Sequence, residues 1–212
     1  MLTSFLLLVL GIALAAVLYQ MFKPAPKRAI PAAPAPAPLD TPTDLWNAKP
    51  GDTISIVGAA ADFSDLDFTV DRRSAYESRG RRWIDLSGEF RGNRVYLEVH
   101  RHPDLEVMGL LDPRRLTLAD VGLSEDRLAG LDRLQDPSQT IGFENKLWNY
   151  DSSMEIGYFE NEQGDGEGLY RWLFREPNGP RFLCIEKWEG QPFDVRLATR
   201  VKPDDITVYR AA

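Results

Sequence analysis

Short runs of alternating apolar and polar residues recur along the chain from Leu45 onward, and turn-forming residues separate them. Such alternation places successive side chains on opposite faces of a strand, which is typical of antiparallel sheet. Glycine and asparagine between the runs tolerate the positive φ that tight hairpin turns require. The pattern predicts strands over residues 53–58, 68–70, 83–86, 94–101, 106–111, 146–150, 154–161, 168–175, 181–188, 195–201 and 206–210.

One segment, residues 124–134, departs from this alternation. It begins with Ser124, a residue type that caps helix N-termini, and acidic residues follow in what would be the first turn. Leu128, Leu131 and Leu134 then recur at every third position, a spacing that favours a helix. We therefore expect a short helix here, between two β-rich halves.

The two β-rich halves resemble each other weakly. Trp83 lies in a strand that a glycine turn joins to a strand led by Arg94, and Trp172 and Arg181 stand in a similar order in the second half. This similarity fits either a duplicated unit or two independent copies of a common hairpin. The expected fold is thus mainly β, with antiparallel sheets in two similar β-rich halves and a short helix between them.

An uncharged apolar run occupies residues 2–22, ahead of the β-rich region. As a helix rising about 1.5 Å per residue it would be roughly 31 Å long, which matches a hydrocarbon core of about 30 Å. A cleaved signal peptide is the alternative, and the small residues at positions 13–16 fit it. No positively charged side chain precedes the run, however, and the run continues past the small residues. We expect an N-terminal transmembrane helix over residues 1–22.

The residues that follow the apolar run indicate an orientation and a spacer. Lys23, Lys27 and Arg28 flank the run on its C-terminal side, and positive flanks stay on the cytoplasmic side of a membrane. Proline and alanine dominate residues 23–44, which favours an extended polyproline II tether over a packed core. The soluble domain, residues 45–212, is therefore expected to face the cytoplasm, with an extracytoplasmic position as the alternative.

The charge of the chain argues against nucleic-acid binding. Acidic residues outnumber basic ones by 32 to 25, which gives a formal net charge of −7, so phosphate backbones are repelled. The single cysteine, Cys184, excludes an intramolecular disulfide. It lies in an apolar run, where we expect a buried thiol rather than a reactive nucleophile.

The two histidines of the chain lie close together at the end of a predicted strand. Strand alternation places Glu98, His100 and His102 on one face, and Glu106 completes the pattern His-x-His-x-x-x-Glu of the first cupin metal motif. Imidazole and carboxylate ligands suit zinc, iron or manganese. A cupin site needs a further histidine that this chain lacks, so a solvated strand end is the competing interpretation.

Arginines concentrate in residues 71–101, which hold eight of them against five acidic residues. Residues 144–194 are acidic, so the two segments could simply complement one another or be solvated. The sharper hypothesis is that Arg72, Arg73, Arg81 and Arg82 contact anionic lipid headgroups of the cytoplasmic leaflet.

Several short motifs of the domain are similar to those of a known family. They are Pro50-Gly51-Asp52, the segment Arg94-Val95-Tyr96-Leu97-Glu98-Val99, the segment Phe182-Leu183-Cys184-Ile185-Glu186-Lys187-Trp188, and the closing Asp205-Ile206-Thr207-Val208. Over roughly residues 47–209 the chain resembles the bacterial domain-of-unknown-function family numbered 4178. The resemblance implies a β-rich domain often found in membrane-associated settings and carries over no catalytic residue. An acidic turn around Gly164 and the apolar N-terminal run depart from the family pattern.

No catalytic constellation emerges from these patterns. The chain contains no Gly-x-Ser-x-Gly and no phosphate-binding glycine loop, so we expect no cofactor and have no motif that indicates an enzyme. We expect a single-pass, membrane-tethered and non-catalytic binding or scaffold module at a bacterial inner membrane, with an unidentified protein partner. The alternative is a metal-binding enzyme or sensor built on Glu98, His100, His102 and Glu106.

Overall fold

The structure, a computed structural model, describes residues 42–101 and 103–211. Antiparallel strands make up most of this part of the chain and one short α-helix accompanies them, which confirms the predicted fold class at this level. Within the described part, no helix is long and apolar enough to cross a membrane. The predicted span over residues 1–22 and the predicted tether up to residue 41 lie outside the described residues.

The elements follow one another along the chain with short connections. The first are the 3-10 helix η1 (Pro42–Asn47) and the strands β1 (Thr53–Ile56), β2 (Leu66–Ser78), β3 (Arg81–Phe90), β4 (Asn93–His100) and β5 (Glu106–Leu110). Next come α2 (Glu125–Leu134), β6 (Thr140–Phe143), β7 (Lys146–Phe159), η2 (Glu160–Glu162), β8 (Glu167–Arg175), β9 (Arg181–Trp188), β10 (Phe193–Val201), η3 (Pro203–Asp205) and β11 (Ile206–Tyr209). Helix η1 includes the last residues that the sequence assigns to the tether.

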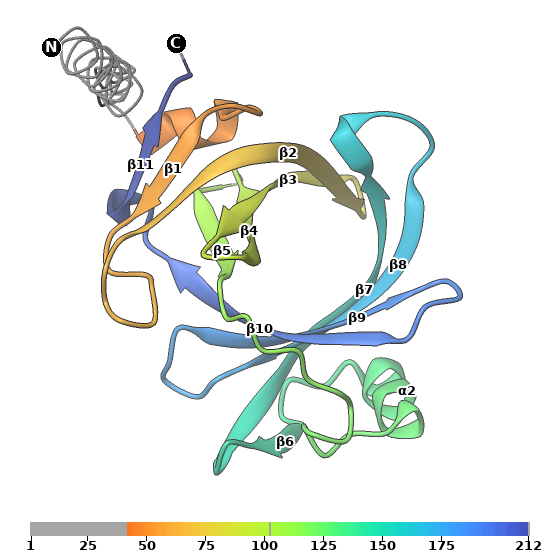
Figure 1. The fold of residues 1–212 in the computed structure, drawn as a ribbon. Coiled ribbons are helices and arrows are strands. Elements are labelled where there is room, and N and C mark those ends of the chain that lie inside the picture. Colours follow the sequence, from red (N-terminus) through yellow and green to blue (C-terminus); the bar gives the residue numbers. More distant parts are fainter. Residues whose placement is uncertain (1–41, 102, 212) are drawn as a thin grey trace, which may run out of the picture. The chain divides into compact units, whose positions relative to one another are not determined.

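The strands form one sheet that closes on itself. Their order is β11-β1-β2-β3-β4-β5-β10-β9-β8-β7-β6, and a further pairing joins β2 to β7. At this seam Ala75 faces Phe159 and Glu77 faces Gly157. The strands β2–β5 and β7–β10 thereby enclose a common interior, while β1, β11 and β6 extend the sheet outside it (Figure 1).

Two four-stranded antiparallel meanders, β2–β5 and β7–β10, make up the closed part of the sheet. They join first strand to first strand through β2 and β7, and last to last through β5 and β10. The long first strand of each meander carries a register shift, at Asp71 in β2 and at Asp151 in β7. Such bulges increase the local twist, which helps a long strand curve around an interior.

The tryptophans that make the two halves look alike in sequence point in different directions. Trp83 of β3 packs inside the closed sheet with Tyr76 and Ile156. Trp172 of β8 packs on the outer face, in the cluster that contains Leu183. The similarity of the two Trp-containing segments therefore does not extend to the environment of their side chains.

Two apolar clusters cover the outside of the closed sheet. Strands β1 and β11 and helix η1 pack on β2–β5, where Phe68 is almost fully buried. Helix α2 and strand β6 cover the outside of β7–β10 around the buried Trp148. Both clusters lie between Leu45 and Val208, and Pro36–Ala212 forms a compact unit by itself. This part of the chain therefore carries its own core.

Candidate ligand-binding site

A cavity of about 1140 Å³ lies inside the closed sheet. The hairpin between β2 and β3 and the chain just after β4 form its mouth, and side chains from β3, β4, β5, β7 and β8 line it. Strand alternation explains this lining, because every second residue of a strand in a closed sheet points inward. The cavity is thus a direct product of the closure between β2 and β7.

Apolar side chains form much of the cavity wall. Trp83 comes from β3, Met108 from β5, Met154 from β7 and Leu173 from β8. The Trp83 ring stacks on that of His100, with 5.1 Å between ring centres and an interplanar angle of 17°. Methionine side chains adapt their shape to irregular neighbours, so this wall suits an apolar guest of variable form.

A charged cluster interrupts the apolar wall deep in the cavity. Arg171 of β8 donates from Nη1 to Glu98 Oε2 at 2.7 Å and from Nε to Glu186 Oε1 at 2.9 Å. Arg196 of β10 donates to Glu186 Oε2 at 3.0 Å. The side chains of Arg171, Glu98 and Glu186 are each at most 3% exposed. Two arginines and two glutamates balance in charge, which lowers the cost of burying them.

The carboxyl groups of Glu98 and Asp85 lie opposite each other on β4 and β3 but differ in protonation. Burial raises the pKa of Glu98, yet the charge of Arg171, the hydrogen bond from Arg171 and the nearby His100 imidazole outweigh it and lower the pKa to about 2. Burial and the nearby charge of Glu98 raise the pKa of Asp85 to about 8. At neutral pH Glu98 is therefore ionised and Asp85 holds a proton.

Four arginines surround the mouth of the cavity: Arg79, Arg81 and Arg82 of the β2–β3 hairpin, and Arg101 after β4. Arg79 and Gly80 both have positive φ, 50° and 73°, which produces the tight hairpin that groups these arginines. Among residues 42–101 and 103–211, the only ion pair of these four is that of Arg82 with Glu77, 3.9 Å apart. The mouth thus concentrates positive charge in a chain of net charge −7.

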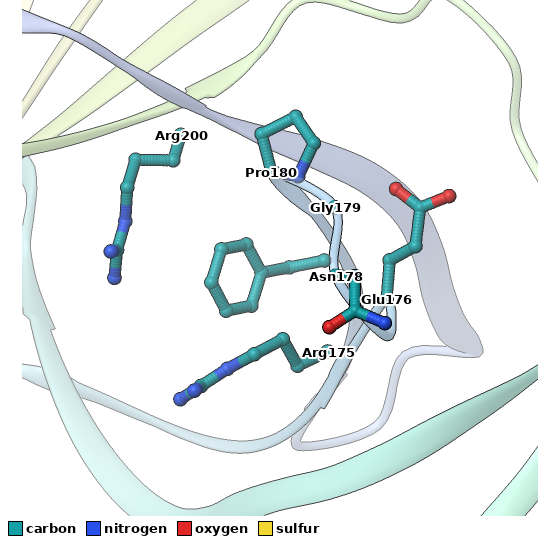
Figure 2. A pocket seen from close by; sticks show the side chains of 7 residues that line it. Arg175, Glu176, Asn178, Gly179, Pro180 and Arg200 are labelled. Atoms are coloured by element: carbon teal, nitrogen blue, oxygen red, sulfur yellow. The ribbon is translucent and has the colours of Figure 1, made fainter.

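A second hollow, of about 310 Å³, lies beside the turn between β8 and β9. Arg175 and Arg200 line this hollow (Figure 2), and the guanidinium carbon of each is 5.8 Å from the ring centre of Phe182, which lines it as well. Arg200 pairs in register with Met108, and Arg175 follows Leu173 on the inward side of β8. Since Met108 and Leu173 line the cavity, this hollow adjoins it and extends the arginine-rich rim.

The predicted metal ligands are only partly brought together. Glu98 is bound by Arg171, and His100 Nε2 lies 3.9 Å from Glu98 Oε2. Glu106 faces His100 across the β4–β5 pair, but its side chain is 61% exposed. His102 lies outside the described residues. In the part of the chain that the structure describes, no group of three or more His, Cys, Asp or Glu side chains could hold a metal ion.

The four arginines predicted to contact a membrane fall into two pairs. Arg72 and Arg73 form ion pairs of 2.8 Å with glutamates of η2, so their charges are used within the protein. Arg81 and Arg82 lie at the mouth of the cavity. Of the four, the second pair is the one placed to meet an external anion.

Some residues of the site carry a signal in the sequence that the prediction did not use. Glu98 and Glu186 each interrupt an apolar strand, in Tyr-Leu-Glu-Val and Cys-Ile-Glu-Lys, and such buried acids need a buried cation. Their partner Arg171 is not apparent from local pattern. Cys184 is buried as predicted, and burial raises the pKa of its thiol, which keeps the sulfur protonated near neutral pH.

Comparison with family models, with curated proteins and with solved structures finds no match to this chain. The similarity to the family numbered 4178 thus remains a resemblance of short motifs. The function is accordingly inferred from the cavity and its charges.

Proposed function

We propose that this domain is a non-catalytic binding module that holds an amphipathic organic anion inside the closed sheet. The observation that carries the proposal is a cavity with apolar walls and a mouth of arginines. Its volume of about 1140 Å³ is ample for a small molecule, since ligand sites occupy about 300–1000 Å³. Closed sheets of eight strands are wide enough to hold one small ligand.

The two ends of such a ligand meet different surroundings. An alkyl chain between Trp83, Met108 and Met154 leaves water, which contributes about 0.8 kcal/mol for each buried CH₂ group. A carboxylate or phosphate at the mouth meets guanidinium groups, which bind such anions through paired hydrogen bonds. Arg79 and Arg81 have no ion pair with a described residue, so no existing pair has to break when the anion binds.

The membrane features expected from the sequence support this proposal. A span over residues 1–22 and a tether over residues 23–44 would keep the domain near a bilayer, where amphipathic anions accumulate. Arg81 and Arg82 would then contact anionic headgroups around the mouth, and Lys23, Lys27 and Arg28 favour the cytoplasmic face of a bacterial inner membrane.

Calorimetric titration of the purified unit, residues 36–212, with matched ten-carbon ligands tests the proposal. We expect decanoate and decyl phosphate to bind at least about ten-fold more tightly than decanol or decyltrimethylammonium, because the mouth attracts only the anions. Absence of binding by every ligand, or equal affinity for decanol and decanoate, would contradict the proposal.

Replacement of the four mouth arginines (Arg79, Arg81, Arg82 and Arg101) by serine should weaken decanoate binding by about ten-fold or more, with a much smaller effect on decanol. The matched control replaces four arginines that do not line the cavity: Arg91, Arg115, Arg127 and Arg133. It changes the net charge equally, so an equal loss of affinity in both variants would attribute the effect to overall charge instead of the mouth.

A further inference from the structure

One carboxylate oxygen of Glu98 lies at the cavity and accepts no hydrogen bond from the described part of the protein. Its Oε2 accepts hydrogen bonds from Arg171 Nη1 at 2.7 Å and from Trp83 Nε1 at 3.2 Å. No described residue donates a hydrogen bond to its Oε1, and this oxygen is not fully buried. Because Glu98 lines the cavity, Oε1 is open to whatever the cavity contains.

The surroundings of Glu98 hold this carboxylate in place and keep it charged. The Glu98 side chain is 2% exposed, and its ion pair with Arg171 belongs to the balanced set that includes Glu186 and Arg196. An ionised oxygen that loses its water without gaining a donor costs free energy. A ligand that fills the cavity therefore has to satisfy Oε1 or bear that cost.

We propose that the cavity selects amphipathic anions whose buried end carries a hydroxyl group, and that Glu98 Oε1 accepts the hydrogen bond of this hydroxyl. The inference rests on the proposed function, because it presupposes an anionic group at the mouth. An unsubstituted alkyl end displaces water from Oε1 and returns no hydrogen bond. A hydroxylated end replaces that water with a charge-assisted hydrogen bond.

The same geometry disfavours a ligand with a second anion at its buried end. Both guanidinium groups of the cluster, Arg171 and Arg196, are already paired with Glu98 and Glu186. A second carboxylate would approach Oε1 as a like charge, at low effective dielectric. Three ligands of equal length that end in a methyl, a hydroxyl or a carboxylate group should therefore bind to the proposed site with different affinities.

Calorimetric titration of residues 36–212 with such sets, at lengths of about eight to sixteen carbons, tests the inference. At the length that reaches Glu98, we expect the hydroxy acid to bind at least about ten-fold more tightly than the unsubstituted acid. The dicarboxylate should bind more weakly than both. If the unsubstituted acids bind and no hydroxy acid binds better, the role of Glu98 is overturned but the proposed function stands. If no acid binds at any length, the proposed function fails as well.

Two variants that each remove one carboxylate from Arg171 test the role of Glu98 directly. Glu98→Gln should reduce the preference for the hydroxy acid to less than about three-fold, because a neutral oxygen is the weaker acceptor. Glu186→Gln alters the same ion cluster, but Glu186 does not line the cavity, so the preference should persist. If Glu98→Gln and Glu186→Gln show the same preference for the hydroxy acid, the assignment of Glu98 as the acceptor is overturned. Circular dichroism checks folding first, and the wild-type ligand series decides the question if either variant is unfolded.

Discussion

At the scale of the residue, Asp85 shows how position in the sheet sets the chemistry of one carboxyl group. It faces the interior opposite Glu98 and forms no ion pair with a described residue. Its Oδ1 is buried and accepts no hydrogen bond from the described part of the chain. Burial and the charge of Glu98 raise its pKa to about 8, whereas the unfolded chain releases this proton near pH 3.8.

Asp85 should therefore make the domain less stable as the pH rises from about 4 to about 8. In this window the folded state holds a proton that the unfolded state has lost, so the free energy of unfolding falls by about 1.4 kcal/mol per pH unit. Asp85→Asn should remove this contribution and exceed the wild type in stability by roughly 2 kcal/mol or more near pH 7.5, with the difference vanishing toward pH 4.

Urea unfolding at several pH values measures this effect, and Asp67→Asn, at an exposed position of β2, serves as the control. An Asp85→Asn variant that is less stable than the wild type near pH 7.5 would show that the proton does not reside on Asp85. The ionised Glu98 contributes in the opposite sense. Its contribution to stability is lost as the pH falls from about 4.5 toward 2.

Individual residues of the site were only partly predictable from the sequence. Glu98 and His100 attract attention because histidines near a carboxylate suggest metal chemistry. Nothing local points to Arg171, which is 73 positions away from Glu98 along the chain. The two meet because β8 lies across the interior from β4, and the closure of a sheet is not encoded in local periodicity.

At the scale of the element, alternation predicted most strands and failed where the pairing is irregular. The predicted strands 146–150 and 154–161 are one strand, β7, whose bulge at Asp151 interrupts the alternation. Strand β2 continues to Ser78, well past the predicted end at Val70, through charged residues that pair with acids of η2. Strand β6 escapes prediction because it has four residues, of which one is glycine.

Helix α2 begins as predicted, after an N-cap at Ser124 whose side chain accepts from the backbone of Arg127 at 3.2 Å. Leu128 and Leu131 are buried, but Leu134 is 60% exposed. Three residues fall about 60° short of a full helical turn, so leucines at this spacing drift around the helix and the third leaves the buried side.

Asp132 attaches α2 to the second meander, and its removal should destabilise the domain. Its Oδ1 accepts hydrogen bonds from Ser153 Oγ at 2.5 Å and from the hydroxyl of Tyr170. Asp132→Ala should lower the free energy of unfolding by about 1–3 kcal/mol, measured by urea denaturation, because these hydroxyls lose their acceptor. Asp165→Ala, in an exposed turn, should have little effect.

The Asp132→Ala variant also separates stability from binding. Helix α2 packs outside the closed sheet (Figure 1), so folded molecules of this variant should bind decanoate as the wild type does. A loss of affinity in the folded variant would show that α2 influences the cavity.

At the scale of the whole molecule, the proposed ligand has to fit into the free volume inside the closed sheet. Leu173 is half-buried and lines the cavity, so a tryptophan there should occupy space that the ligand needs. Leu173→Trp is expected to weaken decanoate binding by about ten-fold or more in calorimetry. The control is Leu147→Trp, on β7, where the residue is 64% exposed. Unchanged affinity in Leu173→Trp would place the ligand elsewhere.

The joining of the two meanders, first strand to first and last to last, also constrains the order in which the chain can fold. The seam pairs residues far apart, such as Ser74 and Tyr158, which are 84 positions apart and joined by a hydrogen bond. A growing chain therefore cannot close its sheet until β7 and then β10, the partner of β5, have been synthesised, and such long-range pairing is slow to form. Until then the inner face of β2–β4 meets water, and Asp85 and Glu98 on that face oppose its self-association. Asp85 and Glu98 are thus also expected to protect the unfinished sheet from aggregation.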